Sequence, residues 1–328
     1  MVSIMSGAVK TVDVSSMSPE KRKKLACNSS TPVDVLVVLA KDAYWYIRAN
    51  VAVNKSAPKD LLVQLAGDES RYVRKSAALN PHTPTSTLLS LAEDEDDEVR
   101  WNVAKNPNTP TYSLALLAKD SSRYVRQSVA QNPNTPATAL VTLVEEKDDG
   151  LLYCVIPNPN LPKSLLVSLS VDKDFRVRYR VAQNPNTPAV ALMALSEDNY
   201  ANVRYYVAQN PNTPADVLVR LSEDKDIDVR MSVARHHSTP KGVCKNMYNE
   251  IVQQDELSEK VASIIIQRNV LEQTEVLALV ALYGEKVAQV VAEKVPIEKN
   301  SLLEKVLTEY NCQAKIQSIE KDVNLARE

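Results

Sequence analysis

The sequence predicts an all-α solenoid, in which short pairs of helices stack one upon the next. Nine of the 18 prolines, from Pro32 to Pro240, follow one another at a spacing of 26 residues, and six more, from Pro81 to Pro211, keep the same spacing. Eight units between Asn28 and Arg235 share the pattern N-P-N-T-P-x-x-x-L-x-x-L-A-x-D-x-x-x-x-V-R-x-x-V-A-x. A fixed period of roughly 20 to 50 residues is typical of stacked supersecondary units.

The first half of each unit predicts one short helix, which we call helix A. In the unit that begins at Asn184, Thr187 is suited to the N-cap and Pro188 to the first helical position, where its missing N–H has no partner to lose. Leu192 and Leu195 follow at i and i+3, so they share one face of the helix. Helix A therefore turns its leucines toward a neighbouring element.

The second half predicts another short helix, helix B. Val203 and Val207 lie on one face, and Asn210 is expected to end the helix in a left-handed conformation before Pro211 prevents its continuation. Helices shorter than about 12 residues are marginal in water. Each unit must therefore bury its leucines and valines against the next, which gives a solenoid without a single central core.

Both ends of the array predict capping segments. Residues 1–27 read as a loose N-terminus followed by a half repeat, in which Arg22 and Ala26 stand in register with Arg48 and Ala52. Residues 28–240 hold the eight regular repeats. Residues 241–328 keep a weaker 26-residue spacing without the N-P-N-T-P signal, which predicts about three degenerate repeats and a C-terminal cap.

The repeated residues resemble a known family. Asp and Arg six residues apart, followed by Val-Ala, then Asn-Pro and a Leu-x-x-Leu helix, are similar to the leucine-rich repeat variant family, which is related to the HEAT-like superhelices. The resemblance covers Asn28 to Pro240 well and implies a right-handed superhelix with one helix of each unit along its inner face. The unit of 26 residues is longer than is usual for that family. The chain also lacks the N-terminal cysteine cluster that holds an iron–sulfur centre in one member, so no cofactor is carried over.

The arginine of each repeat predicts an internal ion pair. Arg100, for example, lies on a helical wheel between Val99 and Ala104, inside the buried arc. A buried charge persists only when it is paired, and we expect the aspartate six residues earlier, here Asp94, to be its partner. The Asn-Pro-Asn column is likewise expected to stabilise the loops.

The opposite side of helix B predicts a binding surface. Its positions vary between repeats and are rich in tyrosine, tryptophan and arginine, the side chains that most often anchor interfaces. The expected partner is a protein or peptide. The residues expected to hold it are Trp101, Tyr153, Arg176, Tyr179, Arg180, Tyr205 and Tyr206.

Packing between repeats and binding of nucleic acid are the alternative interpretations of this surface, and catalysis is a third possibility that the sequence does not favour. The tyrosines can simply stack between neighbouring repeats, with their hydroxyls in water. Aromatics beside a few cations can also stack single-stranded nucleic acid, although a net charge of −2 gives little attraction to a polyanion. Catalysis is not expected, because no nucleophile with its base, no metal-ligand spacing and no phosphate-binding glycine loop stands in the sequence.

Composition and short motifs narrow the classes of protein to which the chain can belong. No apolar run reaches the roughly 18 residues of a membrane span, no secretory signal opens the chain, and the four cysteines form no CxxC pair. We expect a cytoplasmic protein without metal or cofactor. The fifth repeat departs from the pattern, with Glu146 for the aspartate, Leu152 for the arginine, and Gly150 and Pro157 as intrusions. A hinge, an apolar contact patch and simple drift are equally compatible with that departure.

Overall fold

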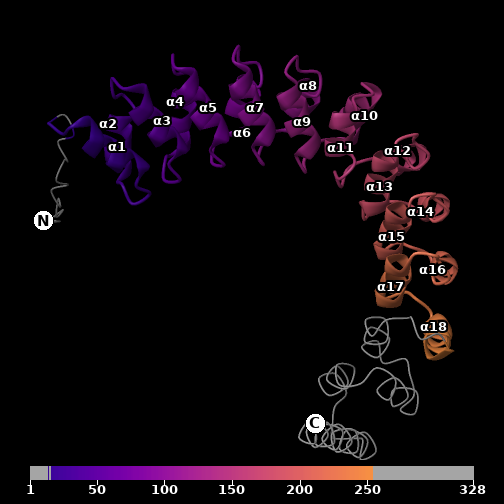
Figure 1. Ribbon diagram of the computed structural model, residues 1–328. Coiled ribbons are helices and arrows are strands. Elements are labelled where there is room, and N and C mark those ends of the chain that lie inside the picture. Colours follow the sequence, from indigo (N-terminus) through magenta and orange to yellow (C-terminus); the bar gives the residue numbers. More distant parts are fainter. Residues whose placement is uncertain (1–13, 15, 254–328) are drawn as a thin grey trace, which may run out of the picture. The chain divides into compact units, whose positions relative to one another are not determined.

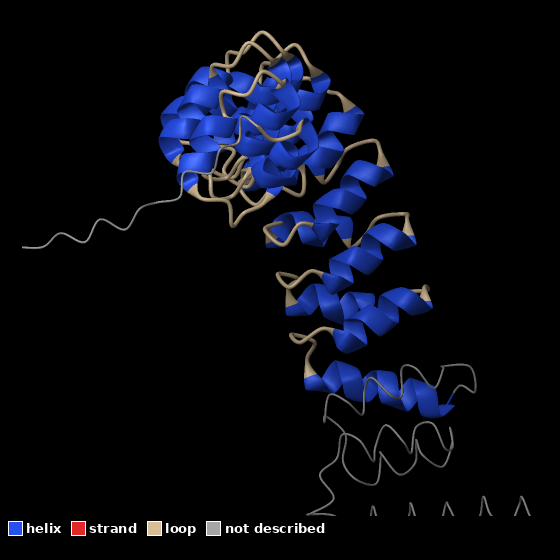
Figure 2. Cartoon of the chain, turned by 90° about the vertical axis from the view of Figure 1, so that its left-hand side faces the viewer, coloured by secondary structure: helices blue, strands red, loops and turns tan. Residues whose placement is uncertain are grey.

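The computed structural model describes residue 14 and residues 16–253, and its regular elements there are all helices (Figure 1). The cartoon in Figure 2 shows only helices and loops in this part of the chain. The chain divides into two compact units, residues 1–166 and 167–328. The predicted all-α repeat fold is thus confirmed. The boundaries at 27 and 240 stay a prediction, as does the right-handed sense, and residues 254–328 lie outside the described part.

In the first unit, A and B helices alternate along the chain after an initial B-type helix. They are seven to nine residues long. The A helices are α2 (Val33–Leu39), α4 (Lys59–Ala66), α6 (Thr85–Leu91), α8 (Thr111–Leu117) and α10 (Ala137–Glu145). The B helices are α1 (Pro19–Cys27), α3 (Trp45–Val53), α5 (Arg71–Leu79), α7 (Asp97–Lys105), α9 (Arg123–Gln131) and α11 (Asp149–Val155).

The second unit repeats the alternation. The helix α12 (Lys163–Leu169) contains the residues at which the first unit ends and the second begins. The later A helices are α14 (Ala189–Leu195) and α16 (Ala215–Leu221). The later B helices are α13 (Phe175–Gln183), α15 (Ala201–Gln209) and α17 (Ile227–Arg235). A longer helix, α18 (Lys241–Gln253), follows them.

The core of each unit is a row of B helices covered on one side by A helices. Within the first unit α3 packs on α5, α5 on α7 and α7 on α9, while each A helix packs on the B helices beside it. Val99, Val103 and Ala104 of α7 are fully buried, and so is Leu88 of α6. The predicted burial of the repeated leucines and valines is confirmed, and it explains how helices of this length stay folded.

The helix ends differ from the expectation. Pro188, not Thr187, precedes the first residue of α14, and the Thr187 hydroxyl instead donates to the Val181 carbonyl at the end of α13. Asn210 follows α15 in an extended conformation, with φ −69° and ψ 125°, not in the left-handed region. The asparagine can keep this conformation because its side chain, unlike a capping glycine, reaches back to the preceding repeat.

The asparagine column forms a ladder between repeats. The Asn106 amide donates from Nδ2 to the carbonyl of Ala78 at 2.7 Å and to that of Asn80 at 2.9 Å, both in the repeat before. Its Oδ1 accepts the N–H of Asn108 at 2.9 Å, which closes the turn. One buried side chain thus pairs with two carbonyls at the end of the preceding helix B and with one N–H of its own loop. The predicted loop-stabilising role is confirmed.

The arginine column forms a second ladder, and its partners correct the sequence-based pairing. Arg48 donates from Nε and Nη2 to the two carboxylate oxygens of Asp68, at 2.7 and 2.8 Å, in the following repeat. The aspartate six residues earlier, Asp42, receives Arg48 only at its backbone carbonyl, at 2.9 Å. The carboxylate at the start of helix B points back toward the preceding repeat. Consequently the pair joins two repeats and is not internal to one.

The same bidentate pair recurs along both units. Its members are Arg22–Asp42, Arg48–Asp68, Arg74–Asp94, Arg100–Asp120, Arg178–Asp198 and Arg204–Asp224. The fifth repeat weakens it, because Glu146 receives only one hydrogen bond from Arg126, at 3.0 Å. Leu152, which stands in the arginine position, is itself buried. The predicted pairing of these arginines with carboxylates is confirmed, but only Arg48 and Arg204 are buried and the others are half-buried. Arg22 of α1 belongs to the same ladder.

Protonation of the aspartates is suppressed by this arrangement. For Asp68 burial is the largest influence and favours the neutral acid, but the hydrogen bonds from Arg48 and from the Ser70 N–H, with the charges of Arg48 and Arg74, outweigh it. The pKa of Asp68 therefore lies below its ordinary value. The pKa values of Asp198 and Asp224 are lowered in the same way. Burial again favours the neutral acid, but hydrogen bonds from an arginine and a backbone N–H, with nearby positive charges, outweigh it.

We predict that Arg204→Ala lowers the free energy of unfolding by roughly 3 kcal/mol, because it leaves the Asp224 carboxylate buried without its partner. Arg126→Ala removes the same side chain from the same column, but its single bond to Glu146 is more exposed, so we expect a loss of only about 1 kcal/mol. Urea denaturation followed by circular dichroism measures both. Equal losses would contradict a ladder whose strength depends on the bidentate pair.

We predict that stability falls on acidification only below about pH 4, where aspartates of an unfolded chain become protonated. Because the folded pKa values of Asp68, Asp198 and Asp224 are lowered, ionised carboxylates stabilise the fold above that pH, and this contribution is lost as the pH drops through the folded values. Thermal unfolding between pH 2 and 7, a range chosen to span the aspartate titration, tests this. A steep loss already near pH 6 would point to other groups.

Candidate partner-binding face

The candidate site lies on the solvent-facing side of the B helices, opposite their buried valines. We call this side the helix-B face and define it by the seven predicted residues. None of the seven is buried: Arg176 and Arg180 are exposed, and the aromatic members are half-buried. These residues are Trp101, Tyr153, Arg176, Tyr179, Arg180, Tyr205 and Tyr206.

Three of the predicted tyrosines form one cluster on α13 and α15. The rings of Tyr179 and Tyr206 meet edge to face with centroids 4.7 Å apart, and those of Tyr205 and Tyr206 do so at 5.1 Å. Gln183 donates a hydrogen bond to the Tyr179 hydroxyl at 3.0 Å. The hydrogen bond with Tyr179, assisted by burial, raises the pKa of Tyr206. The phenol is therefore neutral at physiological pH and can serve as a hydrogen-bond donor.

The two arginines of the same helix have different surroundings. The guanidinium of Arg180 lies 5.8 Å from the centre of the Tyr179 ring and is exposed. Arg176 forms an ion pair at 2.8 Å with Asp174, the residue that caps the same helix and accepts the Arg176 N–H. Arg180 thus extends the tyrosine cluster with a cation, whereas Arg176 is tied to the start of α13.

The structure does not bring the two predicted residues of the first unit together. Trp101 lies on α7 and Tyr153 on α11, and α9 packs between those helices. The exposed Lys105 ammonium lies 4.3 Å from the centre of the half-buried Trp101 ring and makes a cation–π contact with it. The predicted residues of the first unit are therefore separate, whereas the three predicted tyrosines of the second unit form a cluster.

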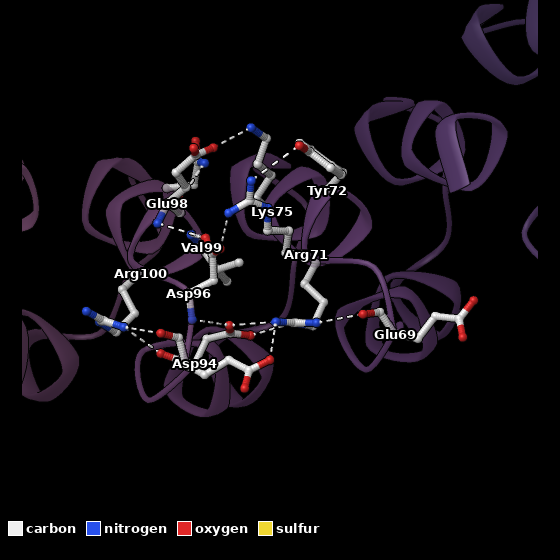
Figure 3. A network of polar contacts seen from close by, with 12 residues as sticks. Glu69, Arg71, Tyr72, Lys75, Asp94, Asp96, Glu98, Val99 and Arg100 are labelled. Carbon is white, nitrogen blue, oxygen red and sulfur yellow. Dashed lines mark hydrogen bonds and ion pairs between the residues drawn. The ribbon is translucent and has the colours of Figure 1, made fainter. Parts of the chain in front are cut away.

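Some exposed or half-buried aromatics connect neighbouring repeats near the start of helix B. The rings of Trp45 and Tyr72 stack with centroids 4.6 Å apart, and those of Phe175 and Tyr200 do so at 4.4 Å. At the same place in other repeats an ion pair makes the connection, as Figure 3 shows for Arg71 and Asp96 at 2.9 Å. The packing interpretation thus holds for these rings.

Sequence reasoning did not identify these connections. The available signal was a pair of residues about one period apart, aromatic with aromatic or arginine with aspartate, as in Arg123 and Asp148. Gly150 belongs to the same arrangement, because a Cβ at that position would collide with the Arg123 guanidinium. The glycine of the fifth repeat therefore leaves room for an ion pair between repeats.

The described residues limit other chemistries. In residues 14 and 16–253, no three His, Cys, Asp or Glu side chains gather where they could share a metal ion. Among the helices of that part, none combines the length and the apolar content that crossing a bilayer requires. His236, one of the adjacent histidines, takes the asparagine place in the ladder, with Nε2 2.9 Å from the Asn210 carbonyl and Nδ1 accepting the Ser238 N–H.

Comparisons with known proteins identify the repeat. A family model described as leucine rich repeat variant matches residues 201–226, which span one period of the array. A solved structure described as a leucine-rich repeat variant with a novel repetitive structural motif is 25% identical, with a TM-score of 0.49, over 70% of this chain and 88% of that one. The Escherichia coli protein YibA is 16% identical over 83% of this chain and 98% of its own, with a TM-score of 0.34. An engineered protein is 17% identical over 88% and 93%, with a TM-score of 0.31.

No curated protein matches the chain. The matched unit is one of eight that share the 26-residue pattern, although the fifth has Glu146 and Leu152 in place of the aspartate and the arginine. Residues 201–226 therefore match the repeat of the leucine-rich repeat variant family, to which this all-α repeat chain is similar.

Proposed function

We propose that the chain is a non-catalytic binding protein that holds a protein or peptide partner on its helix-B face. The observation that carries the proposal is the cluster of Tyr179, Tyr205 and Tyr206, with Arg180 beside it, on the outer side of α13 and α15. Large, rigid, half-polar side chains of these types lose little conformational entropy when they anchor a partner.

The ladders beneath the cluster support the same function. Arg178–Asp198 and Arg204–Asp224 fix α13 and α15 relative to the repeats that follow them, and Asn210 ties the end of α15 to the carbonyls of Ala182 and Asn184. The tyrosines therefore project from helices whose positions are already fixed. Such preorganisation reduces the entropic cost of binding.

Nucleic acid is the second candidate, favoured by one observation. The exposed Lys105 lies over the half-buried Trp101 ring, a pairing of cation and aromatic ring that can stack a base and contact its phosphate. The net charge of −2 weighs against it, because binding to a polyanion draws on many cations. Sensitivity to salt separates the two candidates.

We predict that Tyr179→Ala/Tyr205→Ala/Tyr206→Ala loses the partner that wild-type protein retains from a lysate of the source organism. The retained protein, identified by mass spectrometry and purified, should bind the wild type at least about tenfold more tightly than the variant in calorimetric titration, a difference of roughly 1.4 kcal/mol. The reason is that a cluster of buried anchors provides most of the binding energy of an interface.

The matched control is Tyr200→Ala, which removes a half-exposed ring of the same unit that stacks on Phe175 and lies outside the cluster. Nuclease treatment and titration at high salt complete the design. Recovery that disappears with nuclease and falls steeply with salt would favour nucleic acid. Equal binding by wild type and triple variant would show that the cluster only packs.

A further inference from the structure

One surface position of helix B differs in character between the repeats. It lies two residues after the column of the ladder arginine, and in the B helices α3, α5, α7, α9, α11 and α17 it holds asparagine, serine or cysteine. The side chains of Asn50, Ser76 and Asn102 each donate a hydrogen bond to the carbonyl four residues earlier, at 2.6, 2.8 and 2.8 Å. On α13 and α15 the position holds Arg180 and Tyr206 instead. Most repeats thus fold without a long side chain there, and both exceptions lie at the tyrosine cluster.

Arg180 also differs from the other arginines of its own helix. Arg176 is paired with Asp174 and Arg178 with Asp198, whereas no ion pair between described residues includes Arg180. The contact that Arg180 makes is with the Tyr179 ring, whose centre lies 5.8 Å from the guanidinium. A cation–π contact leaves the N–H donors of a guanidinium available to an acceptor.

The two helices of the cluster provide no acid that could neutralise Arg180. Neither α13, with the sequence FRVRYRVAQ, nor α15, with ANVRYYVAQ, contains aspartate or glutamate. The remaining polar groups of the cluster, the tyrosine hydroxyls and the Gln183 amide, are uncharged. An anion placed beside Arg180 would therefore meet hydrogen-bond donors and no negative charge on these two helices.

We propose that the partner on the helix-B face is an acidic peptide segment, in which one carboxylate binds Arg180 and a neighbouring apolar side chain packs on the tyrosines. This inference rests on the proposed function and names the chemistry of its partner. A guanidinium matches a carboxylate through two parallel N–H···O bonds. The adjoining rings exclude part of the water, so the pair contributes more than an isolated surface pair.

The charges around the cluster favour one carboxylate over a strand of nucleic acid. Arg176 is neutralised by Asp174, and α17, which packs on α15, adds one exposed acid, Asp228, and one exposed base, Arg235. A nucleic-acid strand draws on several cations along its path. The cluster offers a single unpaired guanidinium, which suits a single acidic side chain.

Selection from a phage-displayed library of random peptides, with the full chain as bait, tests the proposal. Peptides of about 12 residues reach about 40 Å when extended and can span two neighbouring B helices. The wild type should enrich peptides with Asp or Glu at a fixed distance from an apolar residue. Arg180→Glu should enrich Lys or Arg at that place, because the required charge is reversed.

A selected acidic peptide should bind Arg180→Ala about tenfold more weakly than the wild type in calorimetric titration. Arg180→Lys should give an intermediate affinity, since lysine keeps the charge but not the bidentate geometry. Arg235→Ala is the matched control, because it removes an exposed arginine of a B helix outside the cluster. It should leave the affinity unchanged.

Two kinds of failure are distinguishable. Peptides that require Tyr179, Tyr205 and Tyr206 but show no preference for acidic residues, or that bind the wild type and Arg180→Ala equally, would overturn this inference and leave the proposed function standing. Tighter, Arg180-dependent binding of single-stranded oligothymidylate would overturn it in favour of nucleic acid. If the wild type enriches no peptide over the triple tyrosine variant, both proposals are overturned.

Discussion

The fold depends on polar contacts that cross from one repeat to the next. A helix of seven to nine residues has too few internal hydrogen bonds to persist in water, and one repeat buries too little apolar surface to compensate. The bidentate bond from Arg100 to Asp120 and the amide bonds from Asn106 to Ala78 and Asn80 join helices that are remote in sequence. Because the arginine points forward and the asparagine backward, a repeat that has both, such as the one with Arg100 and Asn106, is fixed to the repeat after it and to the repeat before it.

These ladders also account for the strict length of 26 residues. Arg48 meets Asp68 twenty positions later, and Asn54 meets carbonyls 26 and 28 positions earlier. An insertion or deletion in one unit would shift these partners out of register at two interfaces at once. Buried charges and amides tolerate such a loss poorly, since each unpaired group keeps its full desolvation cost. The period is thus fixed by hydrogen-bond geometry as well as by packing.

Sequence reasoning reached the repeat, the helices and the pairing of the arginines with carboxylates, because all three follow from periodicity within a unit. It assigned Asp94 to Arg100, and the structure assigns Asp120, because the repeated column places one aspartate before this arginine and another after it. Spacing alone cannot distinguish them. The prediction of a left-handed Asn210 was wrong for a related reason. The Asn210 side chain forms hydrogen bonds to the preceding repeat, and local propensity carries no information about that contact.

The same limit applies to the candidate site. The face of helix B could be predicted from the helical wheel, and the contact between Tyr179 and Tyr206 follows only when α13 and α15 are placed side by side. Trp45 and Tyr72 were not separable in advance from binding residues, because a ring that stacks on the next repeat and a ring that awaits a partner leave the same signature in one sequence. Only the structure distinguishes the two kinds of ring, because it shows whether a side chain of the next repeat lies against the ring.

The fifth repeat shows how the array absorbs a departure from its own pattern. Glu146 is one methylene longer than aspartate and retains only one bond from Arg126, while Leu152 replaces a paired guanidinium by a buried apolar side chain. The aspartate twenty residues after Leu152, Asp172, is retained and accepts the Asp174 N–H, so the change at position 152 removes one partner of the ladder pair and not both. Gly150 meanwhile leaves room for the Arg123–Asp148 pair, which supplies a different polar connection to the same neighbour. The repeat therefore exchanges directional, charge-based coupling for packing, and it keeps burial while giving up part of the geometric constraint that the ladder imposes elsewhere.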